Sequence, residues 1–157
     1  MAAPKWKIKG LNGKFSFRKT SLIILNERLN NLYRLINNFL KIDTEENLHN
    51  VRISLRRLRY NMELFYVLFD KQKFLKLYNM IENLQDNTGY VRDIHIIKQN
   101  ILLFGHQEEI IITNRINARI EEKEKLLNDN LKLELSTFLR SGELMNFMKI
   151  LKKKEVL

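Results

Sequence analysis

The sequence contains no cysteine, only one proline and only five glycines in 157 residues. The absence of cysteine excludes disulfide frameworks, thiolate zinc sites, iron–sulfur clusters and thiol nucleophiles. Long apolar runs are also missing, because segments such as 101–104 and 110–112 are far shorter than the roughly 20 residues that cross a membrane. The basic N-terminus is not followed by an apolar segment, so no signal peptide is predicted. We therefore expect a soluble, cytoplasmic protein that does not interact with membranes.

The scarcity of glycine and proline favours long helices, and apolar residues recur at spacings of three and four. We predict an all-α protein, an antiparallel bundle of long helices in which a four-helix unit is accompanied by extra helical segments. Residues 1–14 form a basic N-terminal arm, and residues 15–157 form a single domain. The predicted helices span residues 15–40, 44–69, 73–85, 91–104, 107–128 and 131–151, the last with a break at Ser141 and Gly142.

Local signals set several of these boundaries. Asp43 stands three residues before Glu46 in a pattern that resembles a capping box, which predicts that the second helix starts near Thr44. Asn and Gly adopt the left-handed helix cap easily, so residues 87–89 predict a helix end, and Gly105 predicts another.

The second predicted helix carries a basic cluster that no acidic residue interrupts. Its members lie within eleven residues: His49, Arg52, Arg56, Arg57 and Arg59. At 100° per residue, all but Arg57 lie on a stripe that borders the apolar face, so the side chains should emerge at a groove between helices. Like charges three and four residues apart repel each other, and the whole chain has a formal net charge of +10. The pattern indicates a polyanionic partner, because the planar arginine fork binds phosphate oxygens bidentately.

On composition alone, a solvated or salt-bridged helix face is an equally good interpretation of the stripe. Glu63 follows Arg59 by four residues, and acidic residues of neighbouring helices could also neutralise the stripe. The order of residues favours the anion site. The run His49-x-x-Arg52-x-x-x-Arg56-Arg57-Leu58-Arg59, followed by Gly89-x-x-Arg92-Asp93, resembles the CHAD family, which is named for its histidine-bearing α-helical domain.

The resemblance covers about residues 46–101 and implies a helical protein that binds inorganic polyphosphate in a basic groove. From the residues themselves we expect no cofactor and no metal held by protein ligands alone, whereas a Mg²⁺ ion could enter with the phosphates. The resemblance implies phosphate contacts from a set of six residues: His49, Arg52, Arg56, Arg57, Arg59 and Arg92. Asp93 is implied as a structural partner of one of these arginines, and Arg28, beside the apolar stripe of the first helix, is a further candidate contact.

Two departures from the family pattern affect the interpretation. The chain has one copy of the motif where the family commonly has two, so we predict that a homodimer completes the groove and that polyphosphate promotes its formation. His95 stands where the family tends to have an aspartate. It either strengthens anion binding or is an incidental surface substitution.

Two other functions remain as alternatives to non-catalytic polyphosphate binding. Nucleic acid is the second choice, since the sequence pI is about 9.8, but the phenylalanines near the stripe fall on the core face and only Tyr60 lies beside it. A metal-dependent phosphohydrolase is the third: His49, Asp93 and His95 would have to hold a divalent cation among arginines that repel it. We therefore expect a binding protein and not an enzyme.

Overall fold

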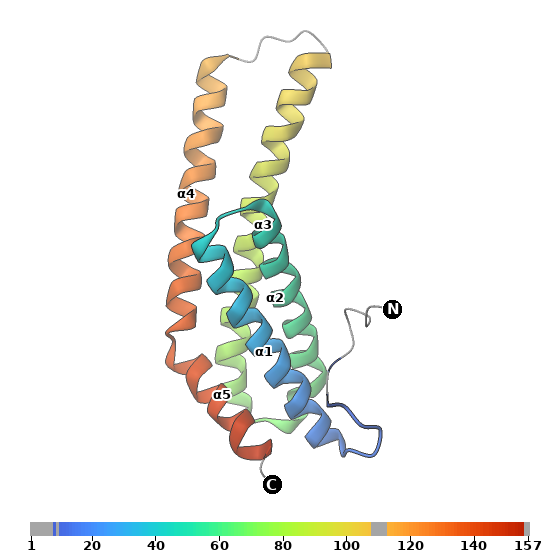
Figure 1. The fold of residues 1–157 in the computed structure, drawn as a ribbon. Helices are drawn as coiled ribbons and strands as arrows, with labels where there is room; N and C mark the ends of the chain where they lie inside the picture. Colours follow the sequence, from blue (N-terminus) through green and yellow to red (C-terminus); the bar gives the residue numbers. More distant parts are fainter. Residues whose placement is uncertain (1–7, 9, 108–112, 156–157) are drawn as a thin grey trace.

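A computed structural model describes residues 8, 10–107 and 113–155 of the chain. The described residues form five α-helices and one short 3-10 helix, Tyr66–Leu68 (Figure 1). The α-helices are α1 (Phe17–Lys41), α2 (Glu45–Phe65), α3 (Lys71–Gln107), α4 (Asn114–Leu139) and α5 (Gly142–Glu155). None of the described helices is long and apolar enough to cross a membrane. The predicted arm, residues 1–14, lies mostly outside the described residues.

Each of the first three helices packs against the next one, and α5 returns to pack against α1 and α3. The apolar stripes predicted for the first two helices are buried, with Leu25 and Leu32 of α1 and Leu55 of α2 all 0% exposed. Burying a large apolar side chain stabilises a fold by roughly 1.5–3 kcal/mol, so these stripes hold the bundle together. The predicted all-α bundle is confirmed.

The two residues that precede α2 contact both α2 and α4. Thr44 is the N-cap, because its hydroxyl accepts a hydrogen bond from the backbone N–H of Asn47 at 3.2 Å. The prediction that Asp43 is the capping residue is wrong by one position. Asp43 contacts α4 instead, where Asn128 donates to its carboxylate at 2.6 Å and Lys132 forms an ion pair with it.

The predicted helix ends at residues 87–89 and at Gly105 are also wrong, because α3 continues through both to Gln107. Thr88 is completely buried and its hydroxyl donates to the backbone oxygen of Gln85. A glycine inside a helix costs about 1 kcal/mol relative to alanine. The buried contacts of Leu84 and Val91 on either side outweigh that cost, and α3 runs for 37 residues, or about 55 Å.

The C-terminal part of α3 and the N-terminal part of α4 extend beyond α1 and α2 as an antiparallel pair (Figure 1). We call residues 100–107 and 114–123 the extension. The predicted break between residues 128 and 131 is absent, because α4 is continuous from Asn114 to Leu139. The predicted break at Ser141 and Gly142 is confirmed, since α4 ends at Leu139 and α5 begins at Gly142.

Candidate anion-binding groove

A groove of about 210 Å³ lies between the N-terminal half of α2 and the middle of α3. It brings together two predicted residues from each helix: His49 and Arg52 from α2, and Arg92 and His95 from α3. Arg52 is half-buried, whereas His49 and Arg92 are exposed. These positions are more than thirty residues apart in sequence, so the antiparallel packing of α2 and α3 creates the site.

The basic stripe continues along α2 away from this groove. Arg56 and Arg57 are exposed, and neither forms an ion pair with another described residue. Arg59 is different. Its Nε lies 3.4 Å from a carboxylate oxygen of Glu63, and its terminal nitrogen lies 3.8 Å from Glu82 on α3. Acidic residues therefore neutralise the charge of Arg59 at one end of the stripe. The charges of Arg52, Arg56 and Arg57 remain available to bind an anion.

Tyr78 of α3 completes this closed end by donating a hydrogen bond to Glu63 at 2.7 Å. Burial, together with the hydrogen bond and the negative charges of Glu63 and Glu82, raises the pKa of Tyr78 to about 12. The phenol therefore keeps its proton and its hydrogen bond throughout the neutral range. This contact fixes Glu63, which in turn holds Arg59.

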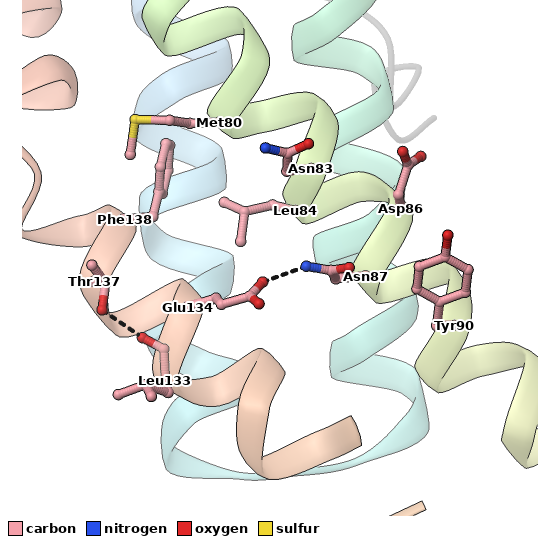
Figure 2. A pocket seen from close by; sticks show the side chains of 10 residues that line it. All are labelled: Met80, Asn83, Leu84, Asp86, Asn87, Tyr90, Leu133, Glu134, Thr137 and Phe138. Atoms are coloured by element: carbon pink, nitrogen blue, oxygen red, sulfur yellow. Dashed lines mark hydrogen bonds between the residues drawn. The ribbon is translucent and has the colours of Figure 1, made fainter. Parts of the chain in front are cut away.

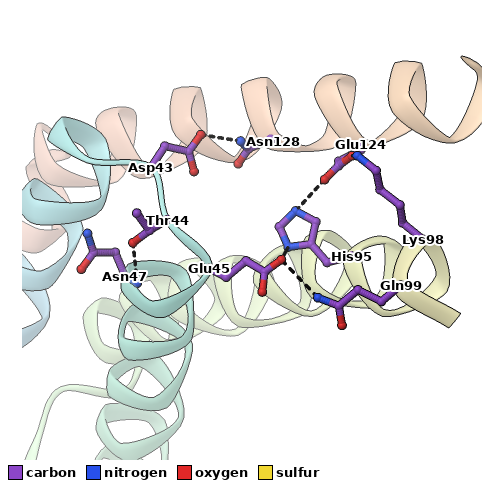
Figure 3. A network of polar contacts seen from close by, with 9 residues as sticks. All are labelled: Asp43, Thr44, Glu45, Asn47, His95, Lys98, Gln99, Glu124 and Asn128. Atoms are coloured by element: carbon purple, nitrogen blue, oxygen red, sulfur yellow. Dashed lines mark hydrogen bonds and ion pairs between the residues drawn. The ribbon is translucent and has the colours of Figure 1, made fainter. Parts of the chain in front are cut away.

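The opposite end of the groove is a network of polar contacts between α2, α3 and α4 (Figure 3). The two ring nitrogens of His95 face carboxylates on different helices, with Nε2 at 3.2 Å from Glu124 and Nδ1 at 3.9 Å from Glu45. Lys98 donates to Glu124 at 2.7 Å, and this hydrogen bond raises the pKa of Lys98. Gln99 donates to Glu45 at 3.5 Å. The network connects the base of the extension to the first turn of α2.

The half-buried position of His95 bears on its two predicted roles. Its side chain is only 17% exposed, which favours a role in the site over an incidental surface substitution. Both of its nitrogens are directed at carboxylates, and His95 therefore joins the helices around the groove in addition to lining it.

Comparison with protein families agrees with this geometry. The family model of the CHAD domain matches residues 3–101, which is more than half of the chain. The chain belongs to the CHAD family. A search of curated proteins and a search of solved structures both found no match. The CHAD match includes α1, α2 and most of α3, and thus every residue that lines the groove.

Two residues that the CHAD resemblance predicted for the site, Arg28 and Asp93, do not line the groove. Arg28 is one turn before Asn31, which donates to Ser54 across the α1–α2 interface, whereas the groove lies between α2 and α3. The Nε of Arg28 is buried, and no described group accepts a hydrogen bond from it. Asp93 is exposed, and no arginine among the described residues pairs with it. The predicted contact between Asp93 and an arginine is therefore not formed in this structure.

Gly89, the glycine of the CHAD motif, faces the groove side of α3 because it precedes Arg92 by three residues. A Cβ atom added to it would meet no other atom within 4 Å. Packing within the chain therefore does not require a glycine at this position. The space beside Gly89 is open to a ligand that lies along the arginine stripe.

The acidic and neutral members of the site were not predicted from the sequence. Ile96 and Gln99 line the groove, and their spacing of four and seven residues from Arg92 was a usable signal. Glu45 lies in the first turn of α2 and also lines the groove. Glu82 and Glu124 reach the site from other parts of the chain, and nothing in their local sequence indicates this. Among the described residues, no group of three or more His, Cys, Asp or Glu side chains is placed to hold a metal ion.

Proposed function

We propose that this CHAD protein binds inorganic polyphosphate, or a related polyphosphorylated anion, along the groove between α2 and α3 without transforming it. The observation that carries the proposal is the convergence of His49, Arg52, Arg92 and His95 on one groove. The stripe continues from it along the helix to Arg56, and Arg57 lies beside the stripe.

Electrostatics supports a polyanion with several consecutive charges. From His49 to Arg59 the helix rises about 15 Å, which suits a chain of phosphates better than a single one. Arginine forks bind phosphate oxygens through charge-assisted hydrogen bonds. No ion pair with another described residue occupies Arg52, Arg56 or Arg92, so these guanidinium groups are available to a ligand. Positioning and neutralisation are the whole mechanism.

The single motif copy leaves one side of the bound anion exposed to water. A second copy of the chain on that side would complete the groove, but two basic stripes repel each other unless an anion lies between them. Polyphosphate should therefore promote this association. Light scattering with and without polyphosphate tests it, and a constant molecular mass at every ligand ratio would favour a one-sided site.

Nucleic acid is the second candidate, and one observation favours it. Tyr60 is 54% exposed and lies beside the stripe, with the guanidinium carbon of Arg59 5.6 Å from its ring centre. An exposed aromatic side chain beside arginines can stack on a base. Single-strand binders usually present several such side chains, whereas Phe65 of α2 is only 2% exposed.

Thermal protection by equal charge concentrations of polyphosphate and single-stranded DNA distinguishes the two candidates. A ligand that binds only the folded state raises the melting temperature, and we expect the larger rise with polyphosphate at near-physiological salt. Greater protection by DNA would reverse the order. Release of orthophosphate from polyphosphate in the presence of Mg²⁺ would show that the protein is an enzyme and contradict the proposed non-catalytic role.

The double substitution Arg52→Ala and Arg56→Ala tests the groove itself. Charge-assisted hydrogen bonds contribute about 1.5–3 kcal/mol each, so we expect polyphosphate affinity to fall at least about 100-fold. The helix should remain folded, because alanine is a better helix former than arginine. The matched control is Lys123→Ala with Lys125→Ala, which removes two exposed positive charges from α4. Equal losses in both variants would mean that net charge, and not the groove, determines binding.

A further inference from the structure

The side of the α3–α4 pair that faces away from the bundle core carries exposed apolar side chains in two regular rows. On α3, Tyr90, Ile97 and Phe104 recur every seven residues, and on α4, Leu126 and Leu133 are also seven residues apart. Their exposed fractions are 59%, 48%, 58%, 52% and 66%, respectively. Residues seven apart share a helix face. We call these five residues the outer rows.

The two rows lie on the same side of the molecule. Tyr90 and Leu133 both line a cavity of about 560 Å³ between α3 and α4, whose floor includes Leu84 and Phe138 (Figure 2). From this cavity the α3 row continues for fourteen residues, about 21 Å, to Phe104 in the extension. A coiled-coil contact has this seven-residue repeat. The outer rows therefore present an apolar face that no other described residue covers.

Charged side chains on the same face change sign from one end to the other. At the cavity end, Asp86 lines the cavity with Glu134, and Asp129 follows Leu126 by three residues. At the extension end, Arg115 and Arg119 precede Leu126 by eleven and seven residues. Asp86, Asp129, Arg115 and Arg119 are all exposed, and none has an ion-pair partner among the residues that the structure describes.

We propose that a second copy of the chain covers this face, with the two α3–α4 pairs antiparallel about a two-fold axis near Ile97. Such an axis places the extension of each copy against the cavity of the other. Asp86 lies eleven residues, about 17 Å, from Ile97 on one side. Lys98, next to Ile97, contacts Glu124 of α4, so Glu124 lies at the level of the axis. Arg115 precedes Glu124 by nine residues and therefore lies about 14 Å from the axis on the other side. The arginines of each copy thus reach the carboxylates of the other.

Net charge also favours self-association at this place. Residues 86–104 and 115–134, which carry the outer rows, together contain seven Lys or Arg and seven Asp or Glu, so the formal charge of +10 belongs entirely to the rest of the chain. Two copies can meet here without the repulsion that opposes contact between the groove stripes. Two helix pairs packed together form a four-helix arrangement, which buries the outer rows. The groove faces the opposite side of α3, so both grooves remain accessible.

Sedimentation velocity of the full chain without any polyanion tests the proposal. We expect a dimer for the natural sequence, and monomers for Ile97→Asp, because an unpaired charge would be buried at the centre of the interface. The control Leu64→Asp replaces a residue of α2 that is 63% exposed and should remain dimeric. Circular dichroism verifies that each variant is folded. A monomeric natural protein, or a dimeric Ile97→Asp variant, would overturn the proposal.

A charge exchange tests the ionic contacts between the two ends of the face. Arg115→Glu with Arg119→Glu makes both ends of the face acidic, and Asp86→Arg with Asp129→Arg makes both ends basic. Each double variant alone should be monomeric, whereas an equimolar mixture should regain the dimer mass, since opposite charges then meet at both ends. Failure of the mixture to associate would exclude these ionic contacts. Because no polyanion is present, neither result depends on the proposed function of the groove.

Discussion

Arg52 and Arg59 are seven residues apart on the same side of α2, but their surroundings give them different roles. Arg59 lies close to the carboxylates of Glu63 and Glu82, so a phosphate would have to compete with two existing partners. Arg52 lines the groove without an acidic partner among the described residues. We therefore expect Arg52 to contribute more to anion binding than Arg59, although both arginines belong to the motif.

Gly89 allows stability and binding to be separated at a single residue. In Gly89→Ala the new methyl group meets no atom within 4 Å, and the gain in helix propensity should stabilise the protein by up to about 1 kcal/mol. If the ligand lies along α3 at this point, the same methyl group should weaken polyphosphate binding. Chemical denaturation and titration calorimetry measure the two effects. Unchanged affinity in a more stable variant would place the ligand away from Gly89.

Tyr78 predicts a loss of stability in alkaline solution. Its pKa rises from 10.0 to about 12 in the folded protein, so the folded state retains a proton that the unfolded state loses above pH 10. The resulting stabilisation is complete below pH 10 and disappears as the pH rises towards 12. In Tyr78→Phe the free energy of unfolding should fall less over this interval. Tyr33→Phe is the control, because Tyr33 is exposed and its hydroxyl forms no hydrogen bond with another described residue. An equal pH dependence in Tyr78→Phe and in the natural protein would contradict this assignment.

At the scale of elements, two threonines at helix starts form a natural comparison. Thr44 caps α2 with its side chain, whereas Thr113 occupies the same position before α4 without a side-chain hydrogen bond. Thr44→Ala should therefore lower the free energy of unfolding by about 1 kcal/mol, and Thr113→Ala should lower it by less. Urea denaturation of both variants measures the difference. Equal effects would show that the cap of Thr44 contributes little in solution.

Features that depend on local interactions could be predicted from the sequence better than features that depend on contacts between distant parts of the chain. The stripes of α1 and α2 could be predicted because burial repeats with the period of the helix, and the start of α2 was correct within one residue. The end predicted at residues 87–89 failed because a local glycine signal of about 1 kcal/mol competes with buried contacts on both sides of it. The groove residues of α2 and α3 were identified as a motif, but their convergence and their acidic neighbours depend on packing that no local pattern records.

At the scale of the whole molecule, the net charge of +10 predicts a strong salt dependence of polyphosphate binding. Binding of a polyanion releases counterions, so the logarithm of the affinity should fall linearly with the logarithm of the salt concentration. Each phosphate contact adds about one unit to the slope, and Arg52→Ala with Arg56→Ala should therefore reduce it by about 2. Titrations at four or more salt concentrations measure both slopes. A flat dependence would indicate a ligand that is recognised without its charge.

The pairing of α1 with α5 has a consequence for the order of folding. Helices α1 to α3 each pack against the next helix in the chain, whereas the contact between α1 and α5 joins segments separated by α2, α3 and α4. Contacts between neighbours in sequence form quickly because the loops that they close are short. We therefore expect the hairpins of successive helices to form early. The docking of α5 on α1 should then be a late step, which sets the folding rate of the bundle.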